Sequence, residues 1–272
     1  GDRICILGSG LTMIDQVLTL RGKGHRGPIH VLSRRGLIPH PHVSPPVPTS
    51  APRLPEGSTE ISELLRSLRQ QVTNGAPWRS VMDGLRPKTQ SLWQSLSSQQ
   101  RARFLRHALP WWNIHRHRIA PEVHDAFDRL LSDGVLTIHA GYLQAIDEQE
   151  ESISIRYRVR HTQMIKELQV DWVINCTGME RAGIGHSRLL ESMRSDGVLW
   201  LDSFGLGVEV DGDSRLLRTD GQAWPGLFAV GALTAGRFWE ITAVPDIRIQ
   251  ARDIAHFITD RVIGKRLISA QG

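Results

Sequence analysis

Apolar and polar positions at the start of the chain predict a strand, a helix and a second strand. Residues 3–7 form a short apolar run, residues 11–20 carry apolar side chains at helical spacing, and residues 29–32 form a second apolar run after a Gly/Pro break. This order is typical of a βαβ unit. We therefore expect the chain to open with one.

The pattern changes between Pro39 and Pro55, where seven of the fourteen prolines lie. Because proline fixes φ and has no N–H to donate, an extended connection is expected there. A helix is predicted to follow, capped by Thr59 and ending in a left-handed turn at Asn74-Gly75. Its apolar positions keep a 3.6-residue spacing: Ile61, Leu64, Leu65, Leu68 and Val72. Further helices are expected over 78–85, 97–108 and 121–132, which together form a helical insertion.

Residues 134–174 alternate between apolar and polar side chains with period two. The segments VLTIHAGYLQAI, SISIRYRVR and LQVDWVINC predict three or four strands with the spacing of antiparallel hairpins. A short helix is predicted over 187–193, and GLFAVGA (226–232) is expected to be a buried strand that ends in a glycine turn.

The last predicted element is a long amphipathic helix that reaches residue 262. Pro245 is expected in its first turn, so the helix should begin near Ala243. The apolar positions that define its inner face are Ile247, Ala251, Ile254, Ala255 and Ile258.

Composition limits the classes of protein to which the chain can belong. It has 272 residues, of which 40% are hydrophobic, as in ordinary globular proteins. The net charge is +5, but arginines alternate with acidic residues instead of forming a basic block, so we do not expect nucleic-acid binding. No apolar run is long enough to cross a bilayer and no signal pattern opens the chain, which favours a cytoplasmic protein without a membrane partner. Cys5 and Cys176 lie within apolar strands and are expected to be buried and reduced.

The segment ILGSGLTMID (6–15) contains a candidate phosphate-binding turn. Gly8 and Gly10 lie between the first strand and the first helix, where a pyrophosphate can approach the unpaired backbone N–H groups of the helix N-terminus. Met13 occupies the position of the third glycine in the dinucleotide fingerprint, where glycine permits close helix packing. The alternative is a simple tight turn. The candidate cofactor-binding residues here are Gly8, Ser9, Gly10, Leu11, Thr12 and Met13.

The end of the second strand distinguishes between the two pyridine nucleotides. An acidic residue at this position would accept hydrogen bonds from the ribose hydroxyls of NAD. The chain instead has Ser33, Arg34 and Arg35, a hydroxyl and two guanidiniums suited to a 2′-phosphate, so NADP is favoured. The alternative is that both arginines are solvated turn residues.

Two later motifs carry a resemblance to a known group of proteins. DWVINCTGME (171–180) is an apolar strand that stops at Thr177-Gly178, and residues 226–258 read as a strand, a glycine turn and a helix. With these motifs the chain resembles bacterial FAD/NAD(P)-binding proteins related to the two-dinucleotide flavoprotein disulfide reductases and flavin monooxygenases.

The resemblance implies FAD as a second cofactor. It implies that the helix N-terminus faces the flavin pyrimidine ring, with the amides of Thr242, Ala243 and Val244 nearest the ring and Trp239 beside it. It also implies cofactor-binding roles for Gly231, in the glycine turn, and for Thr177 and Gly178, at the strand end that joins the two nucleotide domains. At Ala232 the chain departs from the family, which has an acidic residue there. It also lacks the earlier glycine fingerprint for the FAD pyrophosphate, so we expect a C-terminal portion whose partner is a missing N-terminal FAD-binding segment.

The expected fold class is therefore α/β: a Rossmann-like βαβ nucleotide-binding domain with a helical insertion, an antiparallel β segment and a partial FAD-domain ending. The expected domains are 1–40 with 121–180 for NADP, 41–120 for the linker and insertion, and 181–272 for FAD. The expected function is hydride transfer from NADPH to flavin, monooxygenase-like or reductase-like, on a small-molecule substrate that no motif specifies. The rival interpretation is a non-catalytic dinucleotide-binding sensor or subunit.

The segment PWWNIHRHRIAP (110–121) is the remaining candidate for a site. His115 and His117 have no cysteine or carboxylate close in sequence, so metal binding is not expected. The histidines and arginines here could form a basic wall above Trp111 and Trp112, or a packed cap with solvated basic groups. No catalytic residue is assigned, because no nucleophile–base pair or carboxylate pair stands out.

Overall fold

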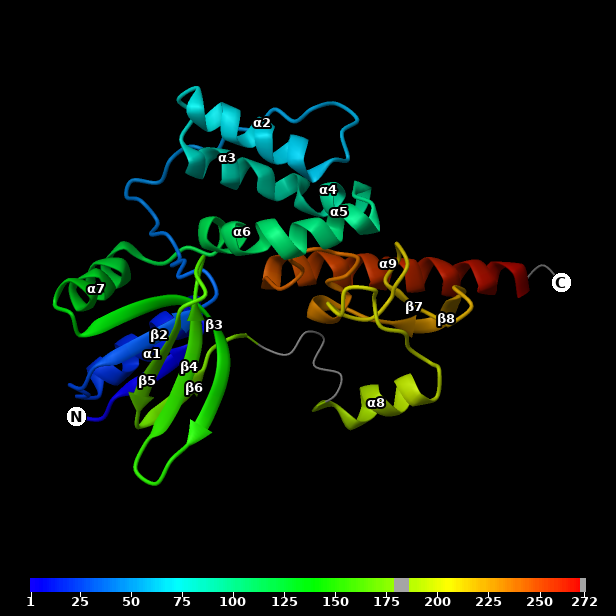
Figure 1. Cartoon of the computed structure of the whole chain (residues 1–272). Helices are drawn as coiled ribbons and strands as arrows, with labels where there is room; N and C mark the ends of the chain where they lie inside the picture. The colour runs from blue at the N-terminus through cyan, green and yellow to red at the C-terminus, as the bar shows by residue number, and fades with distance from the viewer. Residues whose placement is uncertain (179–185, 270–272) are drawn as a thin grey trace. The chain divides into compact units, whose positions relative to one another are not determined.

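The computed structural model describes residues 1–178 and 186–269, with side chains as far as residue 261 (Figure 1). It divides into two compact units. The first consists of Gly1–Arg53, Ser67–Gly84 and Phe104–Gly178, and the second of Leu54–Arg66, Leu85–Arg103 and the chain from Met179 onward. The expected domain boundary at residues 180 and 181 lies outside the described residues.

The first unit opens with the predicted βαβ arrangement. Strand β1 (Ile4–Leu7), helix α1 (Leu11–Gly22) and strand β2 (Ile29–Ser33) follow one another, and β1 pairs with β2 in parallel. On its other side β1 pairs in parallel with β6 (Trp172–Asn175). The first strand of the chain thus lies inside the sheet, between β2 and the edge strand β6, in the order β5-β4-β3-β2-β1-β6.

The long strand β3 (Leu136–Glu148) joins the parallel and antiparallel parts of the sheet. Its first half pairs in parallel with β2, and its second half pairs antiparallel with β4 (Ile153–Val159), with a register shift between Leu143 and Ala145. Strand β5 (Ile165–Val170) pairs antiparallel with β4. The predicted antiparallel strands are therefore confirmed for β3 to β5.

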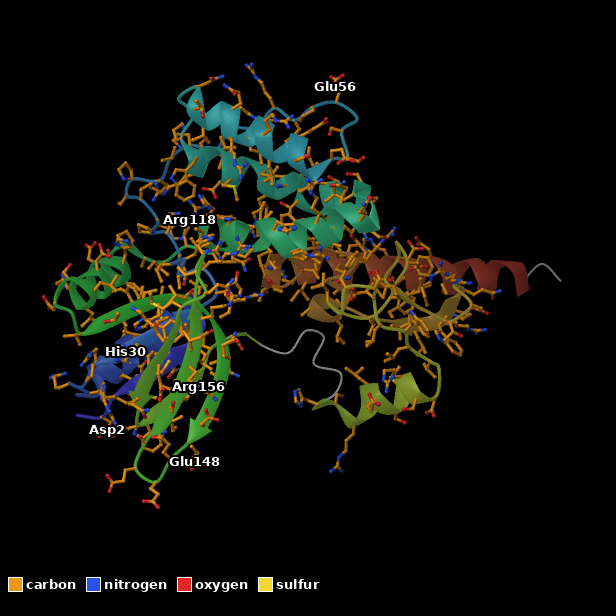
Figure 2. All side chains as sticks on the ribbon, in the orientation of Figure 1. Asp2, His30, Glu56, Arg118, Glu148 and Arg156 are labelled. Carbon is orange, nitrogen blue, oxygen red and sulfur yellow. The ribbon has the colours of Figure 1, made fainter. Side chains whose placement is uncertain are left out.

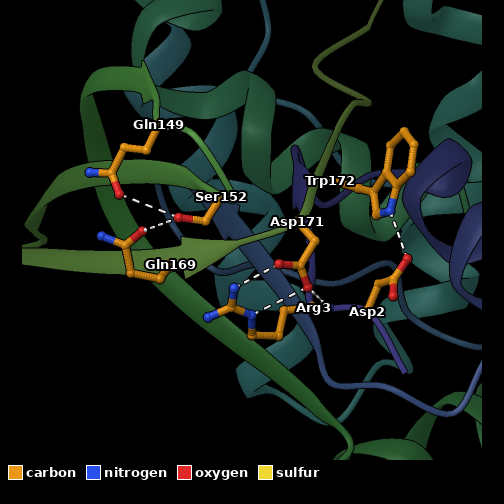
Figure 3. A network of polar contacts seen from close by, with 7 residues as sticks. All are labelled: Asp2, Arg3, Gln149, Ser152, Gln169, Asp171 and Trp172. Atoms are coloured by element: carbon orange, nitrogen blue, oxygen red, sulfur yellow. Dashed lines mark hydrogen bonds and ion pairs between the residues drawn. The ribbon is translucent and has the colours of Figure 1, made fainter.

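The segment LQVDWVINC does not form one strand of this antiparallel set. It is divided at Asp171 into β5 and β6, and β6 joins β1 in parallel. The cause is a clamp between Arg3 and Asp171, seen in Figure 3: the Arg3 amide donates to Oδ2 (2.6 Å) and the guanidinium Nη2 to Oδ1 (2.6 Å). The guanidinium and the amide lower the pKa of Asp171 to about 2. In the same view Trp172 Nε1 donates to Asp2 (2.9 Å), and Ser152 lies between Gln149 and Gln169.

Both faces of the parallel strands are covered. On one face Ile4 and Ile6 pack with Met13, Val17 and residues of α7 (Pro121–Ser132). On the other face Cys5, Leu7 and Leu32 pack against side chains of β4 and β5, because the sheet bends over itself through β3. Burial on both faces explains why β1 and β2 are almost wholly apolar. Cys5 and Cys176 are both buried and free, as expected.

The helices predicted after the proline-rich connection are present with two differences, and the region also contains two helices that were not predicted, Thr89–Ser95 and Leu109–Arg116. Helix α2 begins at Ile61, so Glu60 and not Thr59 precedes it, and the Ser58 hydroxyl accepts from the Glu60 amide. The helix ends as predicted in a turn at Gly75, where φ is 99°. The segment 97–108 is not one α-helix, because its second half is a π-helical turn, Phe104–Ala108. The α-helices of this region are α2 (Ile61–Thr73), α3 (Trp78–Leu85), α4 (Thr89–Ser95), α5 (Ser98–Arg103) and α6 (Leu109–Arg116).

The C-terminal part of the second unit, as far as the structure describes it, contains a small hairpin and the helices α8 and α9. Helix α8 (Arg188–Ser195) is capped by the Ser187 hydroxyl, which accepts from the Leu190 amide. Strands β7 (Arg215–Leu217) and β8 (Ala223–Phe228) pair antiparallel, a 3-10 turn spans Gly231–Thr234, and α9 spans Val244–Ser269. The strand predicted at 226–232 therefore lies earlier, since the chain leaves the ladder at Phe228, and it is not buried as predicted, because Pro225, Gly226 and Leu227 are exposed.

The inner face of α9 also differs from the predicted one. Ile247 contacts the Gly231 turn, Gln250 is buried, and Phe257 packs edge-on against Phe228 (5.9 Å between ring centroids). Ala251, Ala255 and Ile258 are exposed. The helix therefore packs through a stripe that includes a glutamine, which a search for apolar periodicity misses.

Candidate functional site

The candidate nucleotide site lies at the carboxyl edge of the parallel strands in the first unit. The chain leaves β1 toward β2 on one side, while β6 flanks β1 on the other side. Strand β1 thus has the next strand of the chain on one side and a strand from much later in the chain on the other, and such switch points in strand order are where open α/β sheets bind ligands. The turn after β1 and the residues after β6 meet there, since the Cys176 amide donates to the Leu7 carbonyl (2.7 Å).

Gly8 and Gly10 have different structural roles in this turn. Gly8 has φ of 99° and donates to the Leu32 carbonyl (2.8 Å), and a Cβ on it would lie 2.7 Å from the carbonyl carbon of Cys176. Gly10 has an ordinary φ of −88°, and a Cβ on it would meet no atom within 4 Å. Gly8 is thus required by the fold, whereas Gly10 leaves open space in front of the helix.

The N-terminus of α1 presents backbone donors to that space. Gly10 precedes the helix and supplies no side-chain cap, and the first turn contains no acidic residue. The amides of Leu11, Thr12 and Met13 are the first of the helix, which have no partner within it, and they donate to no group in residues 1–178 or 186–269. These donors and the helix dipole together favour an anion.

The neighbouring side chains of the turn are occupied in packing. The Met13 side chain is fully buried between the helix and the sheet, so this residue offers the site its amide only. Met13 thus fills the space that the third glycine of the fingerprint leaves free. The Ser9 hydroxyl donates to the Leu37 carbonyl (2.7 Å) and holds the turn against the loop after β2.

Ser33, Arg34 and Arg35 form a tight turn at the end of β2. The Ser33 hydroxyl accepts from the Gly36 amide (2.9 Å), and Gly36 has φ of 63°. Arg34 is exposed and Arg35 partly so. In the described parts of the chain neither guanidinium pairs with a carboxylate, and Nη2 of Arg35 is 3.5 Å from the Arg106 carbonyl.

Arg160 is a neighbour of this turn that the sequence did not indicate. It lies just after β4, and its Nη1 donates to the Arg34 carbonyl (3.1 Å). The contact depends on how β3 bends and carries β4 back past the end of β2. No motif in the printed sequence shows that bend.

Thr177 and Gly178 complete the edge beside β6. The Thr177 amide and hydroxyl both donate to the Asn175 side-chain oxygen (3.1 and 2.7 Å), and Gly178 has φ of 101°. Both residues are exposed. The structure therefore brings the residues after β1, β2 and β6 to one edge.

Apart from Thr177 and Gly178, the residues assigned to FAD belong to the second unit. Gly231 has φ of 74°, and its amide donates to Oε1 of the buried Gln250 (2.7 Å). Gln250 in turn donates from Nε2 to the hydroxyls of Ser214 (3.1 Å) and Thr234 (3.0 Å). This buried network fixes the Gly231 turn to α9.

The start of α9 leaves two amides available. The Thr242 amide donates to the Glu240 carbonyl (2.7 Å), whereas those of Ala243 and Val244 donate to no group in the described residues. Asp246 lies in the first turn and is 3.7 Å from Nη2 of Arg86. Trp239 stacks on Trp93, with ring centroids 4.6 Å apart.

The segment with two tryptophans and two histidines is engaged in packing. His115 contacts Trp78 and His40 at ring-centroid distances of 4.8 and 4.7 Å, and Trp112 packs edge-on against Phe104. Arg118 forms a mostly buried ion pair with Asp83. These contacts favour the packed-cap interpretation of this stretch. No set of three or more metal-ligating side chains gathers in the described residues.

Ionisable groups with shifted pKa values lie inside the sheet. Nδ1 of His30 is 3.2 Å from Nε2 of His139, whose Nδ1 is 2.9 Å from the hydroxyl of the buried Tyr157. Burial lowers the pKa of His139 to about 4, with smaller contributions from His30 and Lys166, and burial also lowers the pKa of His30. Both rings are therefore neutral at pH 7 (His30 is labelled in Figure 2).

Solved structures of flavin-dependent monooxygenases share this fold. Ornithine hydroxylase (PvdA) from Pseudomonas aeruginosa matches with 16% identity and a TM-score of 0.58, over 96% of this chain and 53% of that chain. Ornithine N-hydroxylase KtzI from Kutzneria sp. 744, described with reduced FAD, NADP+ and L-ornithine, matches with 15% identity and a TM-score of 0.59, over 96% and 54%. L-lysine 6-monooxygenase from Pseudomonas syringae matches with 17% identity and a TM-score of 0.55, over 95% and 53%.

These matches confirm the Rossmann-like α/β fold. The chain spans about half the length of the solved proteins it matches. No family model matches the sequence, and no curated protein matches it. Within the described residues, every helix is too short or too polar to cross a membrane.

Proposed function

We propose that this chain is the NADPH-binding portion of an FAD-dependent oxidoreductase that transfers a hydride from NADPH to flavin. The observation that supports this proposal most directly is the open, uncapped N-terminus of α1 at the switch point of the sheet. One strand away, the guanidiniums of Arg34 and Arg35 form no ion pair in the described chain. The likeness to monooxygenases that use FAD and NADP+ supports the same proposal.

The pyrophosphate of the nucleotide would bind at the helix. The amides of Leu11, Thr12 and Met13 point along the helix axis, and the partial positive charge of the helix end adds to them. The space before Gly10 fits a group that must approach the backbone closely. The Gly8 turn holds this geometry because its own amide is already bonded to Leu32.

The adenosine end of the nucleotide would lie at the end of β2. Arg34 and Arg35 would bind the 2′-phosphate, since neither guanidinium is neutralised by a carboxylate in the described chain. The Ser33 hydroxyl accepts a hydrogen bond from the Gly36 amide, so its own proton is still available to be donated to the phosphate. The absence of an acidic residue at this position in the sequence favours NADPH over NADH.

The flavin would be held in part by the second unit. When bound, FAD would accept the hydride and pass electrons to oxygen, as in a monooxygenase, or to another acceptor. The free amides of Ala243 and Val244 fit the role of stabilising negative charge on its pyrimidine ring. Gly231, Thr242 and Trp239 would line the same region, and Thr177 and Gly178 would lie at the connection to it. The remaining FAD contacts would come from an N-terminal segment.

Titration with the two nucleotides tests the proposal. Arg34→Ala with Arg35→Ala should weaken NADPH binding by at least about tenfold and leave NADH binding nearly unchanged, because a charge-assisted hydrogen bond contributes about 1.5 to 3 kcal/mol. Arg156→Ala with Arg194→Ala is the matched control: it removes the same charge from two exposed ion pairs. Equal losses for NADPH and NADH in the first variant would refute the assignment.

A second experiment separates the oxidoreductase from the rival function, a non-catalytic dinucleotide-binding sensor or subunit. A longer polypeptide that includes the FAD-binding segment should be yellow and should bleach when NADPH is added without oxygen. A colourless protein that binds NADPH and does not consume it supports the rival.

A further inference from the structure

The turn that connects β4 and β5 reaches the end of β2. The Arg160 amide donates to the Ala140 carbonyl (2.9 Å), and the turn closes through the Val159 amide, which donates to the Met164 carbonyl (2.9 Å). A Cβ on Gly36 would lie 3.2 Å from the Ala140 Cβ, so the turn after β2 packs against the same part of β3. Two segments more than a hundred residues apart in sequence thus meet at one edge.

The Arg160 guanidinium is held in place and still has free donors. Its Nε donates to Nε2 of His161 (2.9 Å) and its Nη1 to the Arg34 carbonyl (3.1 Å). A guanidinium has five N–H donors; these two bonds use two of them, which leaves three on Nη1 and Nη2. The planar fork of such donors suits bidentate binding of a phosphate.

No acidic side chain competes for this group. Within residues 1–178 and 186–269 Arg160 forms no ion pair with a carboxylate, and the same holds for Arg34 and Arg35. Arg156, four residues earlier in β4, differs: its Nη2 pairs with Asp147 at 3.1 Å. Three arginines without a carboxylate partner in the described chain therefore belong to one edge of the sheet, and the guanidinium of Arg160 contacts the backbone of Arg34.

We infer that Arg160 is a further binding residue for the 2′-phosphate of NADPH, supplied by the β4–β5 turn, and that it sets the preference for NADPH over NADH together with Arg34 and Arg35. This inference rests on the proposed function. Its hydrogen bond to the Arg34 carbonyl orients Arg160 beside the phosphate before the nucleotide arrives. A guanidinium oriented in advance loses less conformational entropy on binding.

The test compares nucleotide affinities of single variants. Arg160→Ala should raise the Kd of NADPH by about tenfold to a hundredfold and leave that of NADH within about twofold. Arg160→Lys, which keeps the charge without the fork, should give an intermediate Kd for NADPH. Arg156→Ala, in β4 and paired with Asp147, should change neither value.

The outcomes are distinguishable from those of the proposed function. An unchanged ratio of the two affinities in Arg160→Ala overturns the inference, whether both nucleotides bind normally or both bind equally weakly through a disturbed turn. If the Arg34 and Arg35 variant loses its preference for NADPH and Arg160→Ala keeps it, the inference alone fails. If the unaltered protein binds both nucleotides equally or binds neither, the proposed function fails as well.

Discussion

At the scale of single residues, the two glycines of the first turn have different roles: Gly8 is needed for folding and, under the proposal, Gly10 is needed for binding. Gly8 is confined by φ of 99° and by the backbone of Cys176, whereas Gly10 has an ordinary φ and open space before it. A methyl group added at Gly8 would therefore overlap the backbone of Cys176, whereas one added at Gly10 would occupy the open space of the proposed site.

Substitution by alanine should show this difference. Gly8→Ala should reduce the free energy of unfolding by about 2 kcal/mol or more, because a left-handed conformation and a steric overlap both oppose the side chain. Gly10→Ala should leave the unfolding midpoint nearly unchanged and weaken NADPH binding by at least about tenfold. Denaturant unfolding and nucleotide titration of both variants measure this, and a Gly10→Ala protein that binds NADPH normally would contradict the site.

Sequence reasoning reached the residues that lie in local motifs. The positions of Gly8, Gly10 and the arginines after β2 follow from a strand–turn–helix–strand pattern, and the structure gathers them at one edge. Arg160 could not be found in this way, because its place depends on the bend and register shift of β3. The stacking of Trp239 on Trp93 was also missed, since the two lie far apart in sequence.

At the scale of elements, the polar residues inside the sheet make stability depend on pH. His139 has a folded-state pKa of about 4 against an ordinary value of about 6.5. The unfolded chain therefore binds more protons than the folded one as the pH falls from 6.5 to 4, and the fold loses stability over this interval. Above pH 6.5 the histidine is neutral in both states and this loss is absent.

Acidification should expose this effect. Going from pH 7 to pH 5, the protein should lose up to about 2 kcal/mol of unfolding free energy through His139. His139→Gln, which cannot titrate, should lose less over the same range, and Lys166→Gln is the control for the smaller charge effect. Urea unfolding at both pH values gives the comparison, and equal losses in the His139 variant and the original protein would contradict it.

The long C-terminal helix is fixed through a polar side chain. Gln250 is buried and makes three hydrogen bonds, to Gly231, Ser214 and Thr234. Gln250→Leu should lower the unfolding free energy by about 2 to 4 kcal/mol, because it leaves buried groups unpaired. Arg252→Leu, on the exposed side of α9, should change it by less than about 0.5 kcal/mol. Similar unfolding midpoints for the two variants would refute this role.

The predictions of helices and strands were wrong where contacts between distant parts of the chain had more influence than the local pattern of apolar and polar residues. Helix α9 was expected to bury Ala251, Ala255 and Ile258, but its contacts run through Ile247, Gln250 and Phe257. The segment 168–176 was predicted as part of an antiparallel set, and the Arg3–Asp171 clamp divides it. Both outcomes depend on contacts between residues that are distant in sequence, and the local pattern of apolar and polar positions carries no information on such contacts.

At the scale of the whole molecule, the chain contains two compact units with different roles in the proposal. The first carries the nucleotide site on a Rossmann-like sheet, and the second carries the Gly231 turn and α9. The fold is shared with monooxygenases of which this chain spans about half the length. Under the proposal, nucleotide binding is expected from the first unit's own residues.

A crystal structure of the chain with saturating NADPH tests the central claim most directly. The account predicts the pyrophosphate against the amides of Leu11, Thr12 and Met13, and the 2′-phosphate among Arg34, Arg35 and Arg160. A structure in which that edge of the sheet holds no nucleotide, or in which the protein's own side chains fill the space before Gly10, would contradict it.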